Sequence, residues 1–206
     1  MVSKCARGVG GYWNADPMLP RQFLRLDSAS TEDMLTDAAA HVLAAGGATA
    51  LSLRAVAAWL KVTPARVSQL VTRDQLPVVV AARFAQRWVD WIEYRRWSES
   101  ALALLPAEPE DVAGVRVWLA LSELARHRTD LSEILDAARD RERDVLTELS
   151  DLHLDQHAAD LVLATADGLR AALCGLGAAL SVTEARSTFA DLLELLGRVT
   201  SRAGCR

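Results

Sequence analysis

Residues 51–71, LSLRAVAAWLKVTPARVSQLV, constrain the fold more than any other stretch of the chain. Apolar side chains recur at helical spacing on both sides of a short break, which predicts two helices joined by a tight turn. Ser52 and Thr63 are expected to cap these helices, and Pro64 takes the first helical position after Thr63, where a helix has no partner for an N–H. Ala57 is small enough to let the two helices cross closely. The stretch therefore predicts a helix-turn-helix.

The rest of the chain also favours helices. Hydrophobic residues make up 51% of the sequence and aromatic residues only 5%, so Ala and Leu supply a helix-forming core. Helical patterns are expected at residues 31–46, 52–60, 63–71, 75–105, 109–127, 131–152, 155–180 and 183–202. No segment reads as a strand, so the predicted fold class is all-α.

No apolar run is long enough to span a bilayer, and we expect no membrane partner. The three cysteines, Cys5, Cys174 and Cys205, are far apart and odd in number. This usage fits a reducing compartment, and the predicted location is cytoplasmic.

Charge is unevenly distributed along the chain. Residues 52–96 carry eight Arg or Lys against three acidic residues, whereas residues 107–206 carry eleven basic and eighteen acidic residues. A basic module is suited to phosphates, and an acidic remainder keeps the protein away from other polyanions. The alternative is that both regions are ordinary solvated helix faces.

The second helix of the predicted motif is expected to present its outer face to the major groove of DNA. Arg66 suits a guanine edge or a phosphate, Gln69 suits an adenine edge, and the capping hydroxyls suit phosphate oxygens. The alternative is a helical hairpin whose polar side chains are merely solvated. The predicted DNA-binding residues are Ser52, Arg54, Thr63, Pro64, Ala65, Arg66, Ser68, Gln69 and Arg73.

Residues 31–81 resemble the N-terminal DNA-binding head of the TetR family of transcriptional regulators, on the stretch MLTDAAAHVLAAGGATALSLRAVAAWLKVTPARVSQLVTRDQL. Residues 157–199, HAADLVLATADGLRAALCGLGAALSVTEARSTFADLLELLGRV, resemble the last two helices of that family, which pair across a dimer. The resemblance implies a homodimeric regulator, most often a repressor, that binds a palindromic operator in double-stranded DNA and is released by a small-molecule effector. It implies a helix-turn-helix domain at residues 30–74 and an effector-binding and dimerisation domain at residues 75–206. Residues 1–29 are expected to form a disordered arm.

The chain departs from the family's pattern at three positions. Lys61 stands where such heads usually have glycine, so a left-handed backbone there is expected to be strained. Ser68 replaces a tyrosine that commonly contacts a phosphate, and Asp74 replaces a lysine that usually begins the fourth helix. Arg73 is expected to take over that contact. These departures keep a second hypothesis open, a dimeric module that binds small molecules or proteins and whose degenerate head does not bind DNA.

Aromatic side chains in the 75–105 and 109–127 segments predict a pocket for a flat apolar or cationic effector, and the alternative is that the tryptophans belong to the core. The predicted ligand-binding residues are Phe84, Trp88, Trp91, Arg95, Trp118, Ser122 and His127.

The last two helices combine leucines with small residues that allow close helix approach, which predicts a four-helix dimer interface. The alternative is that these faces pack only within the monomer. The predicted interface residues are Leu161, Gly168, Ala172, Gly175, Phe189, Leu192, Leu193 and Leu196.

No nucleophile motif, phosphate-binding glycine loop or metal-ligand spacing occurs, so we expect no enzyme, no cofactor and no metal. His153 and His157 are four residues apart and raise a metal alternative. Asp155 is expected to cap a new helix between them, which breaks the common helix face that two ligands would need.

Overall fold

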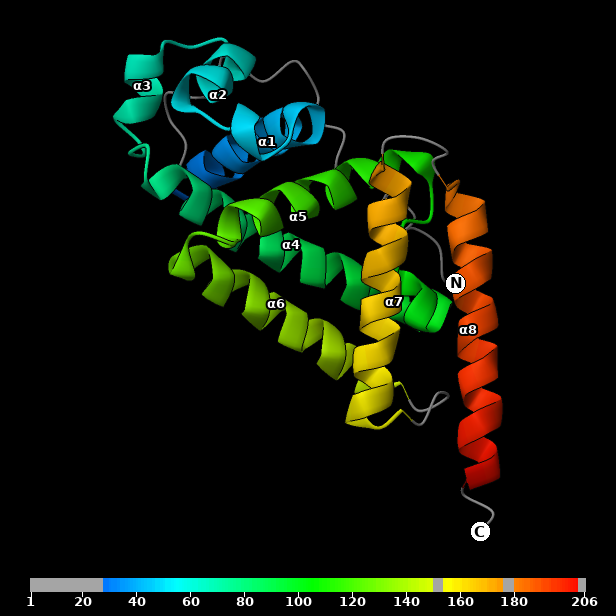
Figure 1. The fold of residues 1–206 in the computed structure, drawn as a ribbon. Helices are drawn as coiled ribbons and strands as arrows, with labels where there is room; N and C mark the ends of the chain where they lie inside the picture. Colours follow the sequence, from blue (N-terminus) through cyan, green and yellow to red (C-terminus); the bar gives the residue numbers. More distant parts are fainter. Residues whose placement is uncertain (1–27, 150–153, 176–179, 204–206) are drawn as a thin grey trace, which may run out of the picture.

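The computed structural model describes residues 28–149, 154–175 and 180–203, and this described part consists of helices and connecting turns without a strand (Figure 1). The helices are α1 (Ser28–Gly46), α2 (Leu53–Leu60), α3 (Pro64–Ser68), α4 (Gln75–Glu99), α5 (Val112–Ala125), α6 (Thr129–Glu148), α7 (Gln156–Cys174) and α8 (Val182–Ala203). Short 3₁₀ helices are η2 (Ala48–Ala50), η3 (Ser100–Leu104) and η4 (Pro109–Asp111). The all-α prediction is confirmed. No helix in the described ranges combines the length and apolarity needed to cross a membrane.

The expected N-terminal arm, residues 1–29, falls almost entirely outside the described residues. Ser28 and Ala29 are the first two residues of α1, so α1 begins slightly earlier than expected.

The helix-turn-helix forms from the local signals in its sequence. The Ser52 side chain accepts a hydrogen bond from the Ala55 N–H at 3.2 Å, and Thr63 Oγ1 accepts one from the Arg66 N–H at 3.3 Å. The small Ala57 is fully buried, as the close crossing of α2 and α3 requires. The predicted caps are therefore confirmed.

The turn between α2 and α3 requires a left-handed backbone at a residue with a side chain. Lys61 has φ 56° and ψ 38°, and its N–H donates to carbonyls of α2. The expected strain at this position is therefore real, because glycine adopts this conformation without the steric cost that a Cβ adds.

The recognition segment is shorter than predicted. Helix α3 ends at Ser68 and not at residue 71 as expected, so Leu70 lies beyond it and is 40% exposed, whereas Val71 is buried. The next helix is fixed by a reciprocal cap that the sequence analysis did not identify. Gln75 N–H donates to Thr72 Oγ1 at 3.2 Å, and Thr72 N–H donates to Gln75 Oε1 at 3.2 Å.

Helix α4 ends at Glu99 and not at residue 105 as expected. Ser100 has φ 51°, and the chain then makes the η3 turn. Buried arginines hold this turn, because Arg95 donates to the Leu105 carbonyl at 2.9 Å and Arg170 donates to the Leu104 carbonyl at 2.7 Å. Side-chain donors thus satisfy carbonyls near the end of η3 that a longer helix would have satisfied internally.

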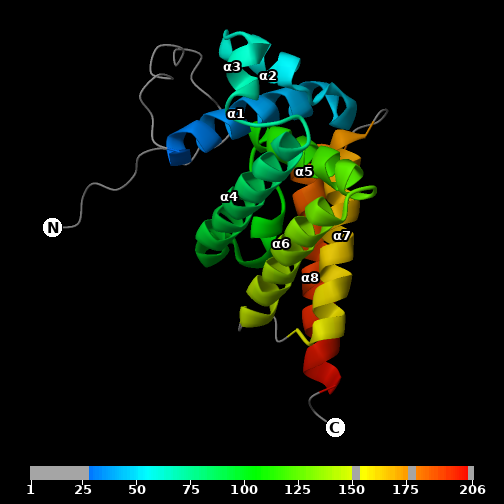
Figure 2. The same cartoon turned by 90° about the vertical axis from the view of Figure 1, so that its left-hand side faces the viewer.

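Figures 1 and 2 show how the helices are arranged. Helices α1–α3 form a head at one end, α4 runs from the head into the body beside α6, and α7 and α8 lie side by side along another face. An ion-pair cluster joins α1 to α4: Arg83 contacts Asp33 at 2.6 Å, and Arg87 contacts both Asp33 and Asp37. The hydrogen bond from Arg83 lowers the pKa of Asp33, with burial opposing it and Arg87 adding to it. These ion pairs therefore tie the head to α4.

Candidate nucleic-acid interface

The predicted DNA-binding residues lie together on the head, at the start of α2, on α3 and in the link to α4. Arg66 is half-buried and the other eight are exposed; they are Ser52, Arg54, Thr63, Pro64, Ala65, Ser68, Gln69 and Arg73. Figure 1 shows α2 and α3 at the outer edge of the molecule, turned away from α7 and α8. The outer face of α3 is therefore open to a partner.

Two candidate base-reading side chains, Arg66 on α3 and Gln69 directly after it, contact each other. Arg66 Nη1 donates to Gln69 Oε1 at 3.2 Å, so the pair is held in one orientation on the exposed face. The Ser68 hydroxyl donates to the Ala65 carbonyl at 2.9 Å. The Ser68 hydroxyl hydrogen is therefore used in a hydrogen bond within α3, whereas a tyrosine at this position would extend its hydroxyl away from the helix.

The capping hydroxyls of the head have a second use. Ser52 and Thr63 accept hydrogen bonds from backbone N–H groups, which leaves the hydroxyl hydrogens of both side chains able to donate. A phosphate oxygen is a suitable acceptor for such a group. Both residues can therefore contact a nucleic-acid backbone without giving up their caps.

The basic residues of the 52–96 stretch fall into two groups in the described structure, those without an ion pair in the head and those paired with carboxylates. Among the described residues no ion pair involves the exposed Arg54, Lys61 or Arg73. In contrast, Arg95 pairs with Glu99 and Arg96 pairs with Glu148 in the body, while Arg83 and Arg87 form the α1–α4 cluster. The interpretation of residues 52–96 as one basic module is therefore wrong, because within this stretch the cations that form no ion pair with a described residue all lie in the head.

Asp74 is exposed in the link between α3 and α4, near the start of α6. The pKa of Arg128 is raised first by its hydrogen bond to Asp130, and the charge of Asp74 adds to that shift. Arg128 thus lies close enough to offset part of the negative charge that Asp74 brings to the head.

The aromatic side chains predicted to bind a ligand fill the core of the body. Phe84, Trp88, Trp91 and Trp118 are at most 3% exposed. The Trp88 ring stacks on Trp118 at 5.3 Å and on Phe84 at 6.1 Å, and its centroid lies 5.4 Å from that of Trp91. The four rings pack against one another. In the described structure they therefore belong to the hydrophobic core and do not line a cavity.

A buried carboxylate completes this core. Glu142 accepts hydrogen bonds from Trp88 Nε1 at 2.7 Å, Arg170 Nη2 at 2.9 Å and Arg139 Nη1 at 2.6 Å. Burial raises the pKa of Glu142, but the charges of Arg170 and Arg139 and the hydrogen bonds outweigh burial and hold that pKa below its ordinary value. Glu142 is therefore ionised at neutral pH, and sequence reasoning missed it because two of its three partners, Trp88 and Arg170, lie on other helices.

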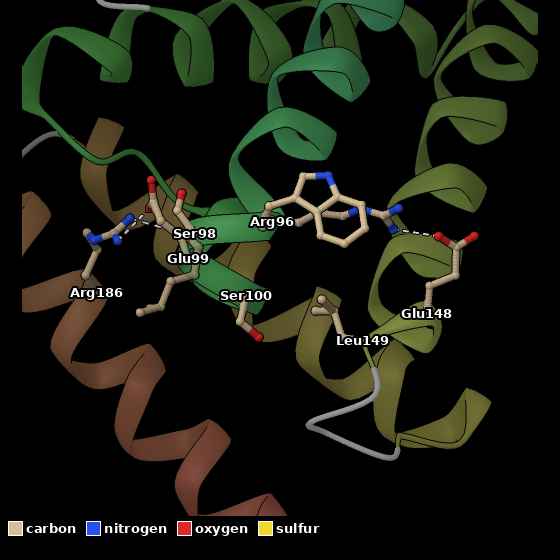
Figure 3. A pocket seen from close by; sticks show the side chains of 9 residues that line it. Arg96, Ser98, Glu99, Ser100, Glu148, Leu149 and Arg186 are labelled. Atoms are coloured by element: carbon tan, nitrogen blue, oxygen red, sulfur yellow. Dashed lines mark hydrogen bonds and ion pairs between the residues drawn. The ribbon is translucent and has the colours of Figure 1, made fainter. Parts of the chain in front are cut away.

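The remaining predicted ligand residues are not brought together. Arg95 is buried over the Trp91 ring at 4.2 Å, the Ser122 hydroxyl donates to the Trp118 carbonyl at 2.9 Å, and His127 is exposed past the end of α5. None of the seven predicted residues lines the pocket of about 650 Å³ that opens elsewhere in the body. That pocket, which the sequence analysis did not identify, lies between the ends of α4 and α6 and the start of α8 (Figure 3).

The predicted dimer face is partly exposed and partly internal. On α7, Leu161 is 48% exposed, and the small residues Gly168, Ala172 and Gly175 are exposed along the same side. Phe189 is fully buried in its own chain, so assigning it to an interface is wrong, because α8 turns this side chain toward the core. On α8, the predicted interface residues Leu192, Leu193 and Leu196 are half-buried, and Leu195, which was not predicted, is 57% exposed.

Only one of the two histidines considered as metal ligands, His157, lies within the described residues. Asp155 caps α7 as expected, with its carboxylate accepting from the Ala158 N–H at 2.8 Å, and His157 is exposed in the first turn. His153 lies outside the described residues. Within the described ranges, no group of three His, Cys, Asp or Glu side chains is arranged to hold a metal ion.

Solved structures share this fold at low sequence identity. A protein described as a TetR-family transcriptional regulator from Rhodococcus sp. matches with a TM-score of 0.64 and 20% identity, over 82% of this chain and 98% of that chain. A transcriptional regulator from Pseudomonas aeruginosa PAO1 matches with a TM-score of 0.68 and 18% identity, over 89% and 98%. The multidrug binding protein EbrR, complexed with proflavin, matches with a TM-score of 0.55 and 19% identity, over 78% and 98%.

No protein-family model matches the chain, and no curated protein matches it in sequence. The chain therefore has the fold of TetR-family regulators, as the sequence resemblance predicted.

Proposed function

We propose that this chain is a homodimeric transcriptional regulator that represses by binding a palindromic DNA operator and is released by a small-molecule effector. The observation that supports this most strongly is the open outer face of α3, with Arg66 and Gln69 on it and the unpaired Arg54, Lys61 and Arg73 around it. A short helix with base-reading side chains and flanking cations suits the major groove.

A two-fold dimer gives this surface its symmetry. The exposed small-residue side of α7 allows a second copy to approach closely, and Leu161 and Leu195 supply apolar area there. Two recognition helices then have to lie one DNA turn, roughly 34–36 Å, or a multiple of it apart, so a palindromic operator follows.

The effector acts by shifting a population of conformations. Helix α4 runs from the head into the body, and the Asp33–Arg83 and Arg87–Asp37 contacts tie α1 to it. A ligand that favours one position of α4 therefore changes how the two heads are spaced. EbrR, which has a similar fold, is complexed with proflavin, and this supports a small-molecule effector for the present chain.

The DNA-binding part is tested by selecting bound sequences from random duplexes with the full-length protein. Arg66→Ala is expected to lose about 1–3 kcal/mol of affinity for the selected duplex, because it removes a base contact together with the hydrogen bond to Gln69. Arg116→Ala, which removes an exposed arginine from α5, is the matched control and is expected to bind normally. If no sequence is enriched and no salt-dependent binding occurs, the head is degenerate and the chain is a small-molecule- or protein-binding dimer.

The dimer is tested at Gly168. A Cβ at this position would meet no atom within 4 Å in the monomer, so Gly168→Leu is expected to fold while blocking close approach of a second copy. Ala137→Leu, at an exposed position on α6, is the matched control and is expected to remain dimeric. Sedimentation equilibrium distinguishes them, and a Gly168→Leu protein that dimerises as tightly as wild type would exclude this interface.

A further inference from the structure

A polar pocket lies on the surface of the body, outside the aromatic core. It is lined by Arg96, Trp97, Ser98, Glu99, Ser100, Leu102, Glu148, Leu149 and Arg186 and has a volume of about 650 Å³. Figure 3 shows it between two ion pairs, with Arg186 and Glu99 on one side and Arg96 and Glu148 on the other. Its residues come from α4, η3, the end of α6 and α8, so a ligand there would touch the end of α4, the helix whose first half is tied to the head.

Three features distinguish this pocket from an ordinary surface depression. Arg96 Nε is buried and lacks a hydrogen-bond partner, the one such side-chain atom found among the described residues. The Trp97 indole is 82% exposed although it is a large aromatic side chain. Ser100 holds a left-handed φ of 51° in the pocket wall. An unsatisfied buried donor and a strained residue are each costly in a folded protein, and here they lie in one pocket together with an exposed aromatic face.

The charges of the pocket favour an anionic ligand. Both carboxylates are already engaged twice: Glu99 pairs with Arg95 and Arg186, and Glu148 pairs with Arg96 and Arg141. A cationic ligand would have to compete with guanidinium groups that are held in place. The group that lacks an acceptor among the described residues is Arg96 Nε, since Arg96 Nη1 already donates to Glu148, and the Arg96 guanidinium lies over the Trp97 ring at 4.8 Å.

We infer that this pocket binds a small aromatic carboxylate as the effector. The ligand carboxylate displaces Glu148 from Arg96 and accepts from the reoriented guanidinium, including the Nε that has no acceptor in the described structure, and the ligand ring lies on the exposed face of Trp97. This inference rests on the proposed function for its regulatory consequence. When Arg96 turns from Glu148 to the ligand, the end of α4 loses an ion pair that joins it to α6. The ligand thereby changes how α4 packs.

The binding step is tested on the full-length protein without DNA, by titration calorimetry with 2-naphthoate, benzoate and the neutral analogue 2-naphthamide. We expect 2-naphthoate to bind at least about tenfold more tightly than 2-naphthamide, since a charge-assisted hydrogen bond is lost in the amide. Binding of neither carboxylate at millimolar concentration, or equal binding of 2-naphthoate and 2-naphthamide, overturns the inference.

Variants separate this site from general charge effects. Arg96→Gln and Trp97→Ala are each expected to weaken 2-naphthoate binding by about tenfold or more, whereas Tyr94→Ala, one turn earlier on α4 and 63% exposed, is expected to leave it unchanged. Glu148→Gln is expected to tighten binding because it removes the competitor for Arg96, and Glu133→Gln at the other end of α6 controls for net charge. Arg96→Gln or Trp97→Ala binding as well as wild type would exclude this pocket.

The regulatory step is measured separately, as the change in affinity for a selected duplex on saturation with 2-naphthoate. A change in duplex affinity that Arg96→Gln abolishes supports the pocket as the effector site. An unchanged duplex affinity despite 2-naphthoate binding contradicts the effector role but leaves the binding site and the proposed DNA-binding function standing. Failure of DNA binding alone contradicts the proposed function and not the pocket.

Discussion

Replacement of Glu142 by glutamine is the most informative test of the body's interior. The Glu142 side chain is 0% exposed, and its two oxygens accept from Trp88, Arg170 and Arg139. A glutamine amide keeps one acceptor oxygen but turns an NH₂ group toward a guanidinium donor. Arg170, which is also 0% exposed, then loses its buried carboxylate partner.

The expected loss of stability in Glu142→Gln depends on the hydrogen-bond partners that Arg170 and Arg139 keep. Removing one partner of a buried ion pair costs about 3–5 kcal/mol. Asp167 still accepts from Arg170 at 3.1 Å and from Arg139 at 2.5 Å, and Arg170 keeps the Leu104 carbonyl. We therefore expect a loss near the lower limit, about 3 kcal/mol, which for a chain of this size lowers Tm by roughly 6–12 °C.

The assay is urea unfolding followed by circular dichroism at fixed protein concentration. Glu133→Gln, an exposed change on the same helix, is the control and is expected to shift stability by less than about 0.5 kcal/mol. A loss below about 1 kcal/mol for Glu142→Gln would refute the idea that this carboxylate holds the core arginines.

The pH dependence gives an independent check on the same residue. The pKa of Glu142 is lowered in the folded state, so its contribution to stability is present above the unfolded glutamate pKa and is lost as pH falls toward the folded value. The difference in unfolding free energy between wild type and Glu142→Gln is therefore expected to shrink below about pH 4. A difference that stays constant down to the acid transition would contradict ionisation of Glu142.

Three further predictions concern the head. Lys61→Gly is expected to stabilise the protein by about 0.5–1 kcal/mol, because it relieves the left-handed backbone at φ 56°, and a urea midpoint that does not rise contradicts this. Asp33→Asn removes a carboxylate that is about one-third exposed, so the expected loss of global stability is below about 1 kcal/mol. Hydrogen exchange of the α1 backbone amides is nevertheless expected to become faster. Unchanged exchange would mean that the α1–α4 ion-pair cluster does not hold the head. Arg73→Ala is expected to weaken binding to all duplexes alike and to reduce the slope of log affinity against log salt by about 1, and an unchanged slope excludes a phosphate contact.

The head was predictable because its determinants are local. Ser52 and Thr63 precede apolar helical patterns and cap them within three residues, and Lys61 follows α2 where a left-handed residue is needed. Each of these signals operates over one turn of the chain. The end of α3 was predicted at residue 71 because the apolar pattern continues to Val71, whereas the helix ends at Ser68.

The body was less predictable because its determinants are distant in sequence. Periodicity places Trp88 and Phe189 on an inward face but does not say whether a cavity, a second copy or a neighbouring helix covers them. The partner of Trp88 Nε1 is Glu142, and the early end of α4 depends on Arg170, far along the chain. Likewise, the positive charge of Arg96 is neutralised by Glu148, which a local count of charges does not include.

The claim that α3 reads DNA in the major groove is tested most directly by guanine methylation interference on a selected duplex. The N7 atom of guanine faces the major groove, so its methylation blocks a contact there. We predict that methylation at one guanine in each half-site prevents binding of the wild-type protein, and that Arg66→Ala is indifferent to methylation at that guanine. Wild-type binding that tolerates methylation at every guanine, or an Arg66→Ala pattern identical to wild type, would contradict the account.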